Sequence, residues 1–238
     1  MSARETSIGA RVRDVLDRLR RKGSKAARDG MARYAIPSDR AFGVSMKDVQ
    51  ALGKALGRDH ALALALWDTG CYEARALCAY VDDPARVTAA QMDRWCRDFD
   101  NWATCDTLCF ALFDRTPHAW RKVAAWTKRK PEFERRAGLA LLASLALHDK
   151  NADDARFAAL LPLVERVADD ERNFVRKAAS WALRSIGARS AALNTATIAL
   201  ARRLAAPDGR TARATGKEVL RELAKPAAQK RLARNAKR

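Results

Sequence analysis

Apolar residues recur at intervals of three and four along most of the chain, which is the spacing of one face of an amphipathic helix. No stretch keeps the alternation of apolar and polar residues that indicates a strand. Gly, Pro, Asp and Asn occupy the joints between the periodic segments. The fold class is therefore predicted to be all-α. The predicted helices cover 11–21, 25–35, 46–56, 59–68, 72–81, 89–99, 102–113, 118–128, 132–147, 152–168, 171–186, 190–205 and 212–223.

One internal repeat is visible in the second half of the chain. The segment Phe133-Glu-Arg-Arg-Ala137 aligns with Phe174-Val-Arg-Lys-Ala178 at an offset of 41 residues, and Leu142 then aligns with Leu183. Pairs of HEAT and armadillo helices repeat every ~40–47 residues. Such pairs stack into a curved solenoid with a concave inner face. We expect one HEAT-like domain over 1–224, with a basic inner face.

The inner helices of this solenoid are predicted to begin near Trp102, Phe133 and Phe174. The segment 225–238 is basic and has few apolar residues, so it is predicted to be a flexible tail. Such a tail either adds non-specific attraction to phosphate groups or only keeps the protein in solution.

The predicted helix 102–113 carries the first candidate for chemistry. Helical spacing places Trp102, Cys105, Asp106, Cys109, Phe110 and Phe113 on one stripe. Five of these suit an interior or a ligand-facing wall, but a carboxylate is costly to bury without a partner. Asp106 is therefore either a functional acid or a residue that caps or ion-pairs with a neighbouring helix.

The charge balance points to a polyanionic partner. The 238 residues include 46 Lys and Arg against 28 Asp and Glu, a net charge of +18. No apolar run approaches the ~18 residues that would span a bilayer, and the first residues lack an apolar signal core. We therefore expect a cytoplasmic protein that binds nucleic acid and no membrane.

The cysteines and histidines do not form a metal motif. The five cysteines (Cys71, Cys78, Cys96, Cys105 and Cys109) contain no C-x-x-C pair, and the three histidines are scattered. The cysteines are interpreted as small buried residues in a reducing compartment. No metal and no cofactor are predicted.

Two further helices contribute candidates. Arg136 lies in the first repeat helix, and Trp181 lies in the second, with Lys177 four residues before it and Arg184 three after it. Together with Trp102 and Asp106, these residues would give one concave wall indole, carboxylate and cationic groups. The alternative is that both tryptophans belong to the core and the arginines are solvated.

In order along the chain, these motifs resemble those of the AlkD-type alkylpurine DNA glycosylases, DNA alkylation repair enzymes built from HEAT-like repeats. The matching motifs are Gly30-Met-Ala-Arg-Tyr34, Trp102-x-x-x-Asp106, Arg136-Ala137 and Phe174-x-x-Lys-Ala-x-x-Trp-x-Leu-Arg184. The resemblance runs from about residue 25 to about residue 220.

The resemblance implies a monomeric, monofunctional enzyme of the bacterial cytoplasm that excises cationic N3- and N7-alkylated purines from double-stranded DNA without base flipping. It makes Asp106 the catalytic carboxylate and packs Trp102 and Trp181 against the deoxyribose of the lesion. Arg136 and Tyr34 become DNA contacts. Lys177 and Arg184 are expected to contact phosphate groups.

The chain departs from the family pattern at three positions. Ala103 stands where an acid often follows the first tryptophan, Ser144 where a lysine follows the arginine, and Asn173 where an aromatic residue precedes Phe174. The departures bear on DNA affinity and substrate range. Two other functions stay open at this point: a non-catalytic HEAT-repeat protein that binds DNA structure, and a scaffold that binds other proteins.

Overall fold

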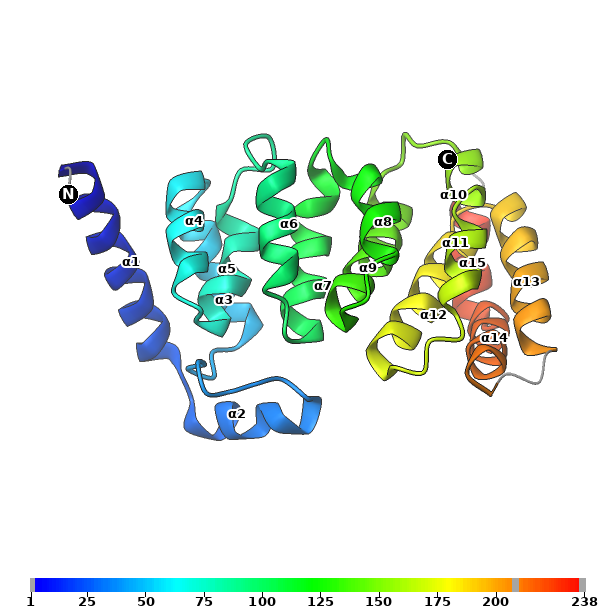
Figure 1. Ribbon diagram of the computed structural model, residues 1–238, viewed down its shortest axis with the longest axis horizontal. Helices are drawn as coiled ribbons and strands as arrows, with labels where there is room; N and C mark the ends of the chain where they lie inside the picture. The colour runs from blue at the N-terminus through cyan, green and yellow to red at the C-terminus, as the bar shows by residue number, and fades with distance from the viewer. Residues whose placement is uncertain (1–2, 207–209, 236–238) are drawn as a thin grey trace. The chain divides into compact units, whose positions relative to one another are not determined.

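The computed structural model describes residues 3–206 and 210–235 (Figure 1). All regular structure in these two ranges is helical, which confirms the all-α prediction. The elements are α1 (Ala3–Lys22), α2 (Lys25–Gly30), η1 (Met31–Tyr34), α3 (Met46–Leu56), α4 (His60–Asp68), α5 (Tyr72–Val81), α6 (Ala89–Arg97), α7 (Trp102–Ala111), η2 (Phe113–Arg115), α8 (Ala119–Thr127), α9 (Glu132–His148), α10 (Asp154–Ala158), α11 (Leu161–Val167), α12 (Asn173–Gly187), α13 (Ala191–Ala205), α14 (Arg210–Leu223) and α15 (Pro226–Asn235).

Two predicted helices are each divided in the structure. The segment 25–35 forms α2 and then the 3-10 turn η1, which ends where Ala35 adopts a left-handed backbone with φ of 54°. The segment 152–168 forms α10 and α11. Pro162, at the start of α11, has no N–H to continue a helix from α10, so the break lies just before it.

The C-terminal segment differs from its prediction. Within 225–238, which we expected to be flexible, α15 is a regular helix over Pro226–Asn235. A proline at the first helical position suits a helix start because its missing N–H would have no partner there. Amphipathic spacing and a favourable N-terminus therefore outweigh the basic composition of this segment. Residues 236–238 lie outside the described part of the chain.

The chain divides into two compact units, Met1–His118 and Ala119–Arg238. The single domain over 1–224 stays a prediction. Within the described residues, no helix is both long enough and apolar enough to cross a membrane.

The first unit is organised around α5, which contacts α3, α4 and α7. Its core contains the indoles of Trp67 and Trp95, stacked with ring centroids 4.2 Å apart and an interplanar angle of 6°. Phe99 packs edge-on against Trp67 at 6.1 Å, and Phe113 lies 6.3 Å from Trp95. The end of α6, the connection to α7 and the residue after α7 are thus held by aromatic contacts.

A buried carboxylate fixes the loop that precedes α3. Glu73 is fully buried and accepts hydrogen bonds from the backbone N–H groups of Phe42, Gly43 and Val44 at 2.7–3.1 Å. Gly43 has φ of +79°, and a Cβ there would lie 2.2 Å from the carbonyl oxygen of Ser24. A side chain is therefore excluded at position 43, and the hydrogen bonds to Glu73 hold the loop between Tyr34 and α3 in this conformation.

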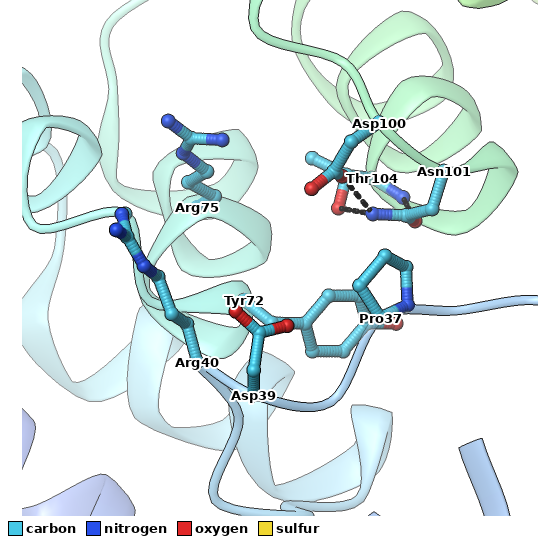
Figure 2. A pocket seen from close by; sticks show the side chains of 9 residues that line it. Pro37, Asp39, Arg40, Tyr72, Arg75, Asp100, Asn101 and Thr104 are labelled. Atoms are coloured by element: carbon cyan, nitrogen blue, oxygen red, sulfur yellow. Dashed lines mark hydrogen bonds between the residues drawn. The ribbon is translucent and has the colours of Figure 1, made fainter. Parts of the chain in front are cut away.

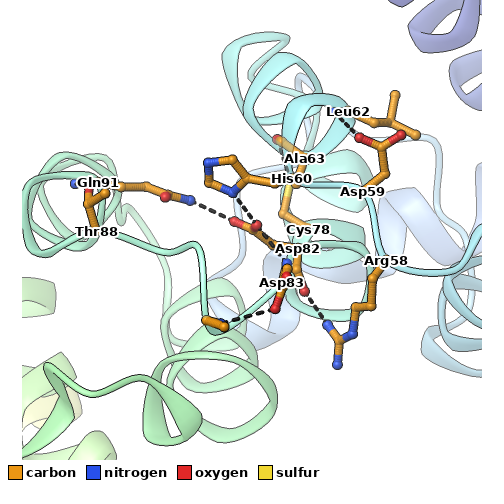
Figure 3. Close-up of polar contacts among 11 residues, drawn as sticks. Arg58, Asp59, His60, Leu62, Ala63, Cys78, Asp82, Asp83, Thr88 and Gln91 are labelled. Atoms are coloured by element: carbon orange, nitrogen blue, oxygen red, sulfur yellow. Dashed lines mark hydrogen bonds and ion pairs between the residues drawn. The ribbon is translucent and has the colours of Figure 1, made fainter.

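A second buried carboxylate joins α4 to α6 (Figure 3). Asp82 is fully buried; His60 Nδ1 lies 2.6 Å from its Oδ1, and Gln91 Nε2 donates to its Oδ2 at 2.6 Å. Burial raises the pKa of Asp82, while the hydrogen bonds to His60 and Gln91 oppose that rise. The nearby Cys78 thiol donates to backbone carbonyl groups, and burial raises its pKa well above the usual range. We therefore assign the cluster to packing.

The second unit contains the repeat. Its helices α9, α12 and α14 lie side by side, with α8, α11 and α13 packed against them (Figure 1). The repeat-related Phe133 and Phe174 rings lie 5.4 Å apart. The aligned apolar pairs, Ala137 with Ala178 and Leu142 with Leu183, are all fully buried. These apolar pairs thus occupy equivalent places in neighbouring helix pairs, as the offset predicts.

Candidate nucleic-acid interface

The start of α7 is fixed by the side chain of Asn101. Its Oδ1 accepts the backbone N–H of Thr104 at 2.9 Å, which is an N-cap. Its Nδ2 donates to Asp100 Oδ1 at 2.7 Å and to Thr104 Oγ1 at 3.2 Å. Trp102 is therefore the first residue of the helix, held where the chain enters α7.

The buried face of α7 is rotated by about one position from the predicted stripe. Its buried residues are Thr104, Cys105, Leu108 and Cys109, followed by Leu112 and Phe113. Trp102 and Asp106 are partly exposed and Phe110 is exposed, whereas Cys105, Cys109 and Phe113 are buried. The predicted stripe is therefore divided between the two alternatives: three residues are interior, and the other three face outward, where a ligand could reach them.

The rotation gives α7 an open row. Trp102, Asp106 and Phe110 follow one another at intervals of four residues, so they are neighbours on one side of the helix. Asp106 therefore stands between two aromatic residues at the surface. The Asp106 carboxylate is partly exposed to solvent, so it avoids the full free-energy cost of burying a charge.

Trp102 connects this row to a segment far away in the sequence. Its indole Nε1 donates to the backbone oxygen of Tyr34 at 2.8 Å, across 68 residues. The Tyr34 side chain is 66% exposed, and Phe110 is 38% exposed. In the described part of the chain, these two are the exposed large hydrophobic residues. We call Tyr34, Trp102, Asp106 and Phe110 the α7 surface.

A polar cavity of about 220 Å³ adjoins the N-terminus of α7 (Figure 2). Figure 2 shows the guanidinium groups of Arg40 and Arg75 on one side and Asp100 with Asn101 on the other. Tyr72 also lines it, and burial, together with the charge of Glu73, raises the Tyr72 pKa to about 12. Asp106 does not line this cavity. The cavity is therefore a polar recess beside the α7 surface and does not enclose the predicted catalytic carboxylate.

In the second unit, α12 carries the other candidates. Phe174, Lys177, Trp181 and Arg184 follow one another at helical spacing, and we call them the α12 row. Lys177 is exposed, while Trp181 and Arg184 are partly exposed. Arg184 Nε donates to the backbone oxygen of Ser180 at 3.2 Å. Trp181 is thus a surface tryptophan with cationic neighbours, not a core residue.

Arg136 occupies a different environment from the one expected. It is only 6% exposed, its Nη1 donates to the backbone oxygen of Phe174 at 2.6 Å, and its guanidinium lies 6.0 Å from the Phe174 ring centre. It therefore joins α9 to the first turn of α12. A contact between Arg136 and DNA stays a prediction.

A charged cluster fixes the segment that leads into α12. Asp170 Oδ2 accepts from Arg172 Nη2 at 2.5 Å and from Arg135 Nη1 at 2.9 Å. Hydrogen bonding to Arg172, and then to Arg135, holds the pKa of Asp170 at about 2 against burial. The backbone N–H of Phe174 donates to Glu132 Oε1 at 3.3 Å. Together these contacts set the position at which the α12 row begins.

The three departures from the family pattern lie in different environments. Ala103 is partly exposed next to Trp102, and Asn173 is exposed at the start of α12. Ser144 is fully buried, with its Oγ 3.4 Å from His148 Nδ1. A lysine at 144 would have to place its charge in the core of the second unit, so its replacement by serine suits the packing.

The five cysteines are buried thiols, as expected. Burial and contact with Cys105 raise the pKa of the Cys109 thiol well above its usual value, which makes it a poor nucleophile. No group of three or more potential metal ligands occurs among the residues that the structure describes.

The structure thus assembles the predicted residues in two sets. Trp102, Asp106 and Tyr34 come together in the first unit, and Lys177, Trp181 and Arg184 in the second. The sequence analysis did not assign Phe110 to a site. Its spacing of four residues from Asp106 was the signal that could have identified it as a surface residue.

Comparison with known proteins supplies a family and a fold. A model of the DNA alkylation repair enzyme family matches residues 15–232. No curated protein matches the chain. A solved structure from a new family of proteins related to the HEAT-like repeat DNA glycosylases, with affinity for branched DNA structures, is 16% identical and has a TM-score of 0.76. The alignment covers 92% of this chain and 95% of that one. A designed armadillo repeat protein in complex with a (KR)4 peptide is 11% identical over 89% of this chain and 88% of its own, with a TM-score of 0.36.

Proposed function

This chain belongs to the DNA alkylation repair enzyme family, and from that premise we propose that it is a DNA glycosylase that excises cationic N3- and N7-alkylated purines. The observation that carries the proposal is Asp106, a partly exposed carboxylate on the open side of α7, one turn from Trp102 and one turn from Phe110. Such a group can approach a ligand without first leaving a core.

The chemistry needs little help at the base. An N3- or N7-alkylated purine carries a positive charge, and it leaves as a neutral base when the glycosidic bond breaks and the electron pair goes to the purine. The deoxyribose becomes oxocarbenium-like in that step. A carboxylate close to the sugar stabilises the developing charge, which is the term that most often dominates enzymatic rate enhancement.

Asp106 is proposed to act in this way and to orient the attacking water. Water adds its oxygen to C1′ of the sugar, and its proton is released through Asp106 to solvent. The products are the free alkylated base and an abasic site. The reaction is a hydrolysis, so it uses no redox or group-transfer partner.

Trp102 and Trp181 are proposed to face the sugar of the lesion. Indole faces attract cations by ~0.5–1 kcal/mol when exposed and by about 2 kcal/mol or more where water is excluded. An interaction that grows with the charge on the sugar contributes to catalysis and not only to binding. Trp102 is suited to this role because its N–H is already held by Tyr34, which leaves the ring face as the available contact.

The remaining residues are proposed to bind the duplex. Lys177 and Arg184 would contact phosphate groups, and the exposed ring of Tyr34 would lie beside the DNA. Arg136 is better suited to hold the start of α12 in place, because its guanidinium already donates a hydrogen bond to the Phe174 carbonyl. The enzyme is proposed to act as a monomer in the bacterial cytoplasm, where its DNA substrate lies, and to leave the base in the helix.

Replacement of Asp106 tests the proposal. Asp106→Asn keeps the shape and removes the charge, so release of 7-methylguanine and 3-methyladenine from methylated duplex DNA should fall by at least about a hundredfold in single-turnover assays. Affinity for the duplex should be equal or slightly higher. Asp14→Asn, at an exposed carboxylate of α1, is the matched control and should release base at the wild-type rate. Release by Asp106→Asn at the wild-type rate would remove the catalytic assignment.

A second candidate function is binding of DNA structure without excision. The exposed aromatic rings of Tyr34 and Phe110 favour it, because such rings stack on unpaired bases. The related family of known structure with affinity for branched DNA belongs to the same fold. This candidate predicts tight binding of a four-way junction and no base release by the wild-type protein. Base release above the spontaneous rate decides for the glycosylase.

A further inference from the structure

The cavity beside the N-terminus of α7, which we call the α7 recess, has side chains of both charges. Arg40 and Arg75 line it on one side, and Asp39 and Asp100 supply two carboxylates (Figure 2). The carboxylates repel a phosphate group and the guanidinium groups repel a metal cation, so the recess is suited to neither. Its balanced charge suits a neutral ligand that accepts hydrogen bonds at one end and donates them at the other.

The recess contains polar groups that the surrounding protein leaves available. Within residues 3–206 and 210–235, the side chains of Asp39 and Arg40 make no hydrogen bond or ion pair. Asp100 accepts from Asn101 with its Oδ1 at 2.7 Å, and its Oδ2 makes no hydrogen bond in the same ranges. Arg40 therefore offers donors on one side of the recess, and Asp100 offers an acceptor on the other.

Gly70 leaves room for the Arg40 guanidinium. Its φ of +67° lies in the left-handed region that favours glycine, and a Cβ there would lie 2.8 Å from Arg40 Nη1. The backbone oxygen of Arg40 accepts the N–H of Tyr72 at 2.9 Å, which ties this segment to the start of α5. A missing side chain and a backbone contact therefore place Arg40 at the recess.

Arg75 is held on the same side by contacts with the protein behind it. Its Nη1 donates to the backbone oxygen of Asp98 at 3.2 Å, and its Nε donates to the backbone oxygen of Trp67 at 3.4 Å. The guanidinium also lies 4.9 Å from the Trp67 ring centre. These contacts leave further N–H groups of the guanidinium for a ligand. A side chain that is already fixed loses little conformational entropy on binding.

The size and the walls of the recess suit a flat ring system. Its volume of about 220 Å³ is below the ~300 Å³ at which pockets for drug-sized ligands begin, so a single base is a better match than a larger molecule. Pro37 and the half-buried Tyr72 each contribute a ring to the wall. Aromatic rings stack on the faces of bases.

Guanine has the pattern of donors and acceptors that matches the recess. Its N7 and O6 accept hydrogen bonds, and an arginine paired with these two atoms is the commonest specific contact between a protein and a base. Its N1–H and N2 amino group lie away from N7 and donate, so a carboxylate can accept from both. Adenine presents the acceptor N1 where guanine presents a donor. We propose that the α7 recess is a binding site for a guanine base.

The recess adjoins the α7 surface through two connections of the chain. Asn101 lines the recess and is followed by Trp102, the first residue of α7. Pro37 lines it three residues after Tyr34, whose carbonyl accepts the Trp102 N–H. DNA held at the α7 surface can therefore present an unpaired guanine to the recess. Asp106 does not line the recess, so this guanine is not the base that the proposed reaction excises.

Duplexes with one bulged nucleotide test the proposal by fluorescence anisotropy. The wild-type protein should bind a bulged guanine at least about fivefold more tightly than bulged 7-deazaguanine, which lacks N7, or bulged hypoxanthine, which lacks the N2 amino group. These two affinity ratios report the arginine side and the carboxylate side of the recess separately. Because each is a ratio between duplexes of the same charge, general phosphate attraction cancels.

Two variants assign the ratios to residues. Arg40→Met removes the donors and should bring the 7-deazaguanine ratio towards one, while the hypoxanthine ratio is kept. Asp100→Asn replaces the free acceptor by a donor and should do the reverse. Arg94→Met and Asp68→Asn are the matched controls, because this exposed pair lies outside the recess, and they should keep both ratios. Melting temperatures of the two recess variants should match the wild type, since both side chains are exposed.

Equal affinity of the wild-type protein for the three bulged bases would overturn the proposal, as would equal changes in the recess and control variants. Calorimetric titration with guanosine identifies the source of the base. Binding that is lost in Arg40→Met would show that the recess takes free guanine, and no binding, with the ratios kept, would show that it takes guanine presented by DNA. None of these measurements uses base release, so they keep their meaning whether or not the protein is a glycosylase.

Discussion

At the scale of single residues, exposure separates the tryptophans into two groups. Trp67, Trp95 and Trp126 are fully buried, whereas Trp102, Trp120 and Trp181 are partly exposed. Truncation of a core tryptophan costs ~3–5 kcal/mol of stability. Truncation of Trp102 or Trp181 should instead slow base release and cost less stability.

We expect Trp102→Ala and Trp181→Ala each to slow base release about tenfold, since each indole contributes ~1–2 kcal/mol to the charged transition state. Affinity for undamaged DNA should change little. Single-turnover release and thermal melting are measured side by side, with Trp126→Ala as the buried control. A melting temperature that falls as far in Trp102→Ala as in Trp126→Ala would show that Trp102 acts as a core residue.

Phe110 offers a second comparison on the same helix. Phe110 is 38% exposed, whereas Phe113, three residues later, is fully buried. Phe110→Ala should therefore cost about 1 kcal/mol of stability or less, and Phe113→Ala ~3–5 kcal/mol. If Phe110 contacts DNA, only Phe110→Ala should weaken duplex binding while the fold stays intact. Urea unfolding measures the stability of both variants, and anisotropy titration measures their affinity for the duplex. Wild-type affinity in Phe110→Ala would show that Phe110 does not contact DNA.

At the scale of elements, the segment before α12 depends on a titratable group. Asp170 has a pKa of about 2 in the folded protein because of Arg172 and Arg135, well below its usual value of about 3.8. Its folded pKa is depressed, so its contribution to stability is present above the unfolded value and is lost as pH falls through the folded value.

Asp170→Asn should therefore lower the free energy of unfolding by about 2 kcal/mol at pH 7. The difference from the wild type should shrink as pH falls from 4 towards 2, where Asp170 itself becomes protonated. Urea unfolding of both proteins at pH 7, 5 and 3 checks this. A difference that stays constant across that range would mean that the carboxylate charge does not stabilise α12.

At the scale of the whole molecule, the net charge of +18 predicts a strong salt dependence of DNA binding. Lys177→Ala and Arg184→Ala should each reduce the slope of log affinity against log salt by about 0.9, the effect of one lost phosphate contact. Arg136→Ala should instead lower the melting temperature, because it removes the hydrogen bond that joins α9 to the first turn of α12. A reduced slope with unchanged stability in Arg136→Ala would restore Arg136 as a DNA contact.

Selectivity among damaged bases should also follow from the reaction mechanism as a whole. If the enzyme stabilises a cationic sugar and does not enclose the base, rates should follow the lability of the glycosidic bond. Cationic N3- and N7-alkylpurines should be released, while the neutral lesions hypoxanthine and 1,N6-ethenoadenine should not. A panel of duplexes, each with one lesion, measures this under single-turnover conditions. Efficient release of a neutral lesion would indicate a base-binding pocket.

The sequence by itself determined the helical class and the HEAT-like repeat, and it proposed the members of the candidate site except Phe110. Helix periodicity is a property of residues three and four apart, and caps such as Asn101 and breaks such as Pro162 act on adjacent residues. The offset of 41 residues is likewise written in the chain, and the contact between Phe133 and Phe174 follows from it.

Only the tertiary structure decided how these helices are rotated and which charges are buried. On α7, two overlapping stripes are both compatible with the spacing, and the packing of Thr104 and Leu108 against the first unit leaves Trp102, Asp106 and Phe110 open. Arg136 is buried because a carbonyl 38 residues away accepts its hydrogen bond. A local pattern fixes which residues share a face, but the partner that covers that face comes from distant parts of the chain.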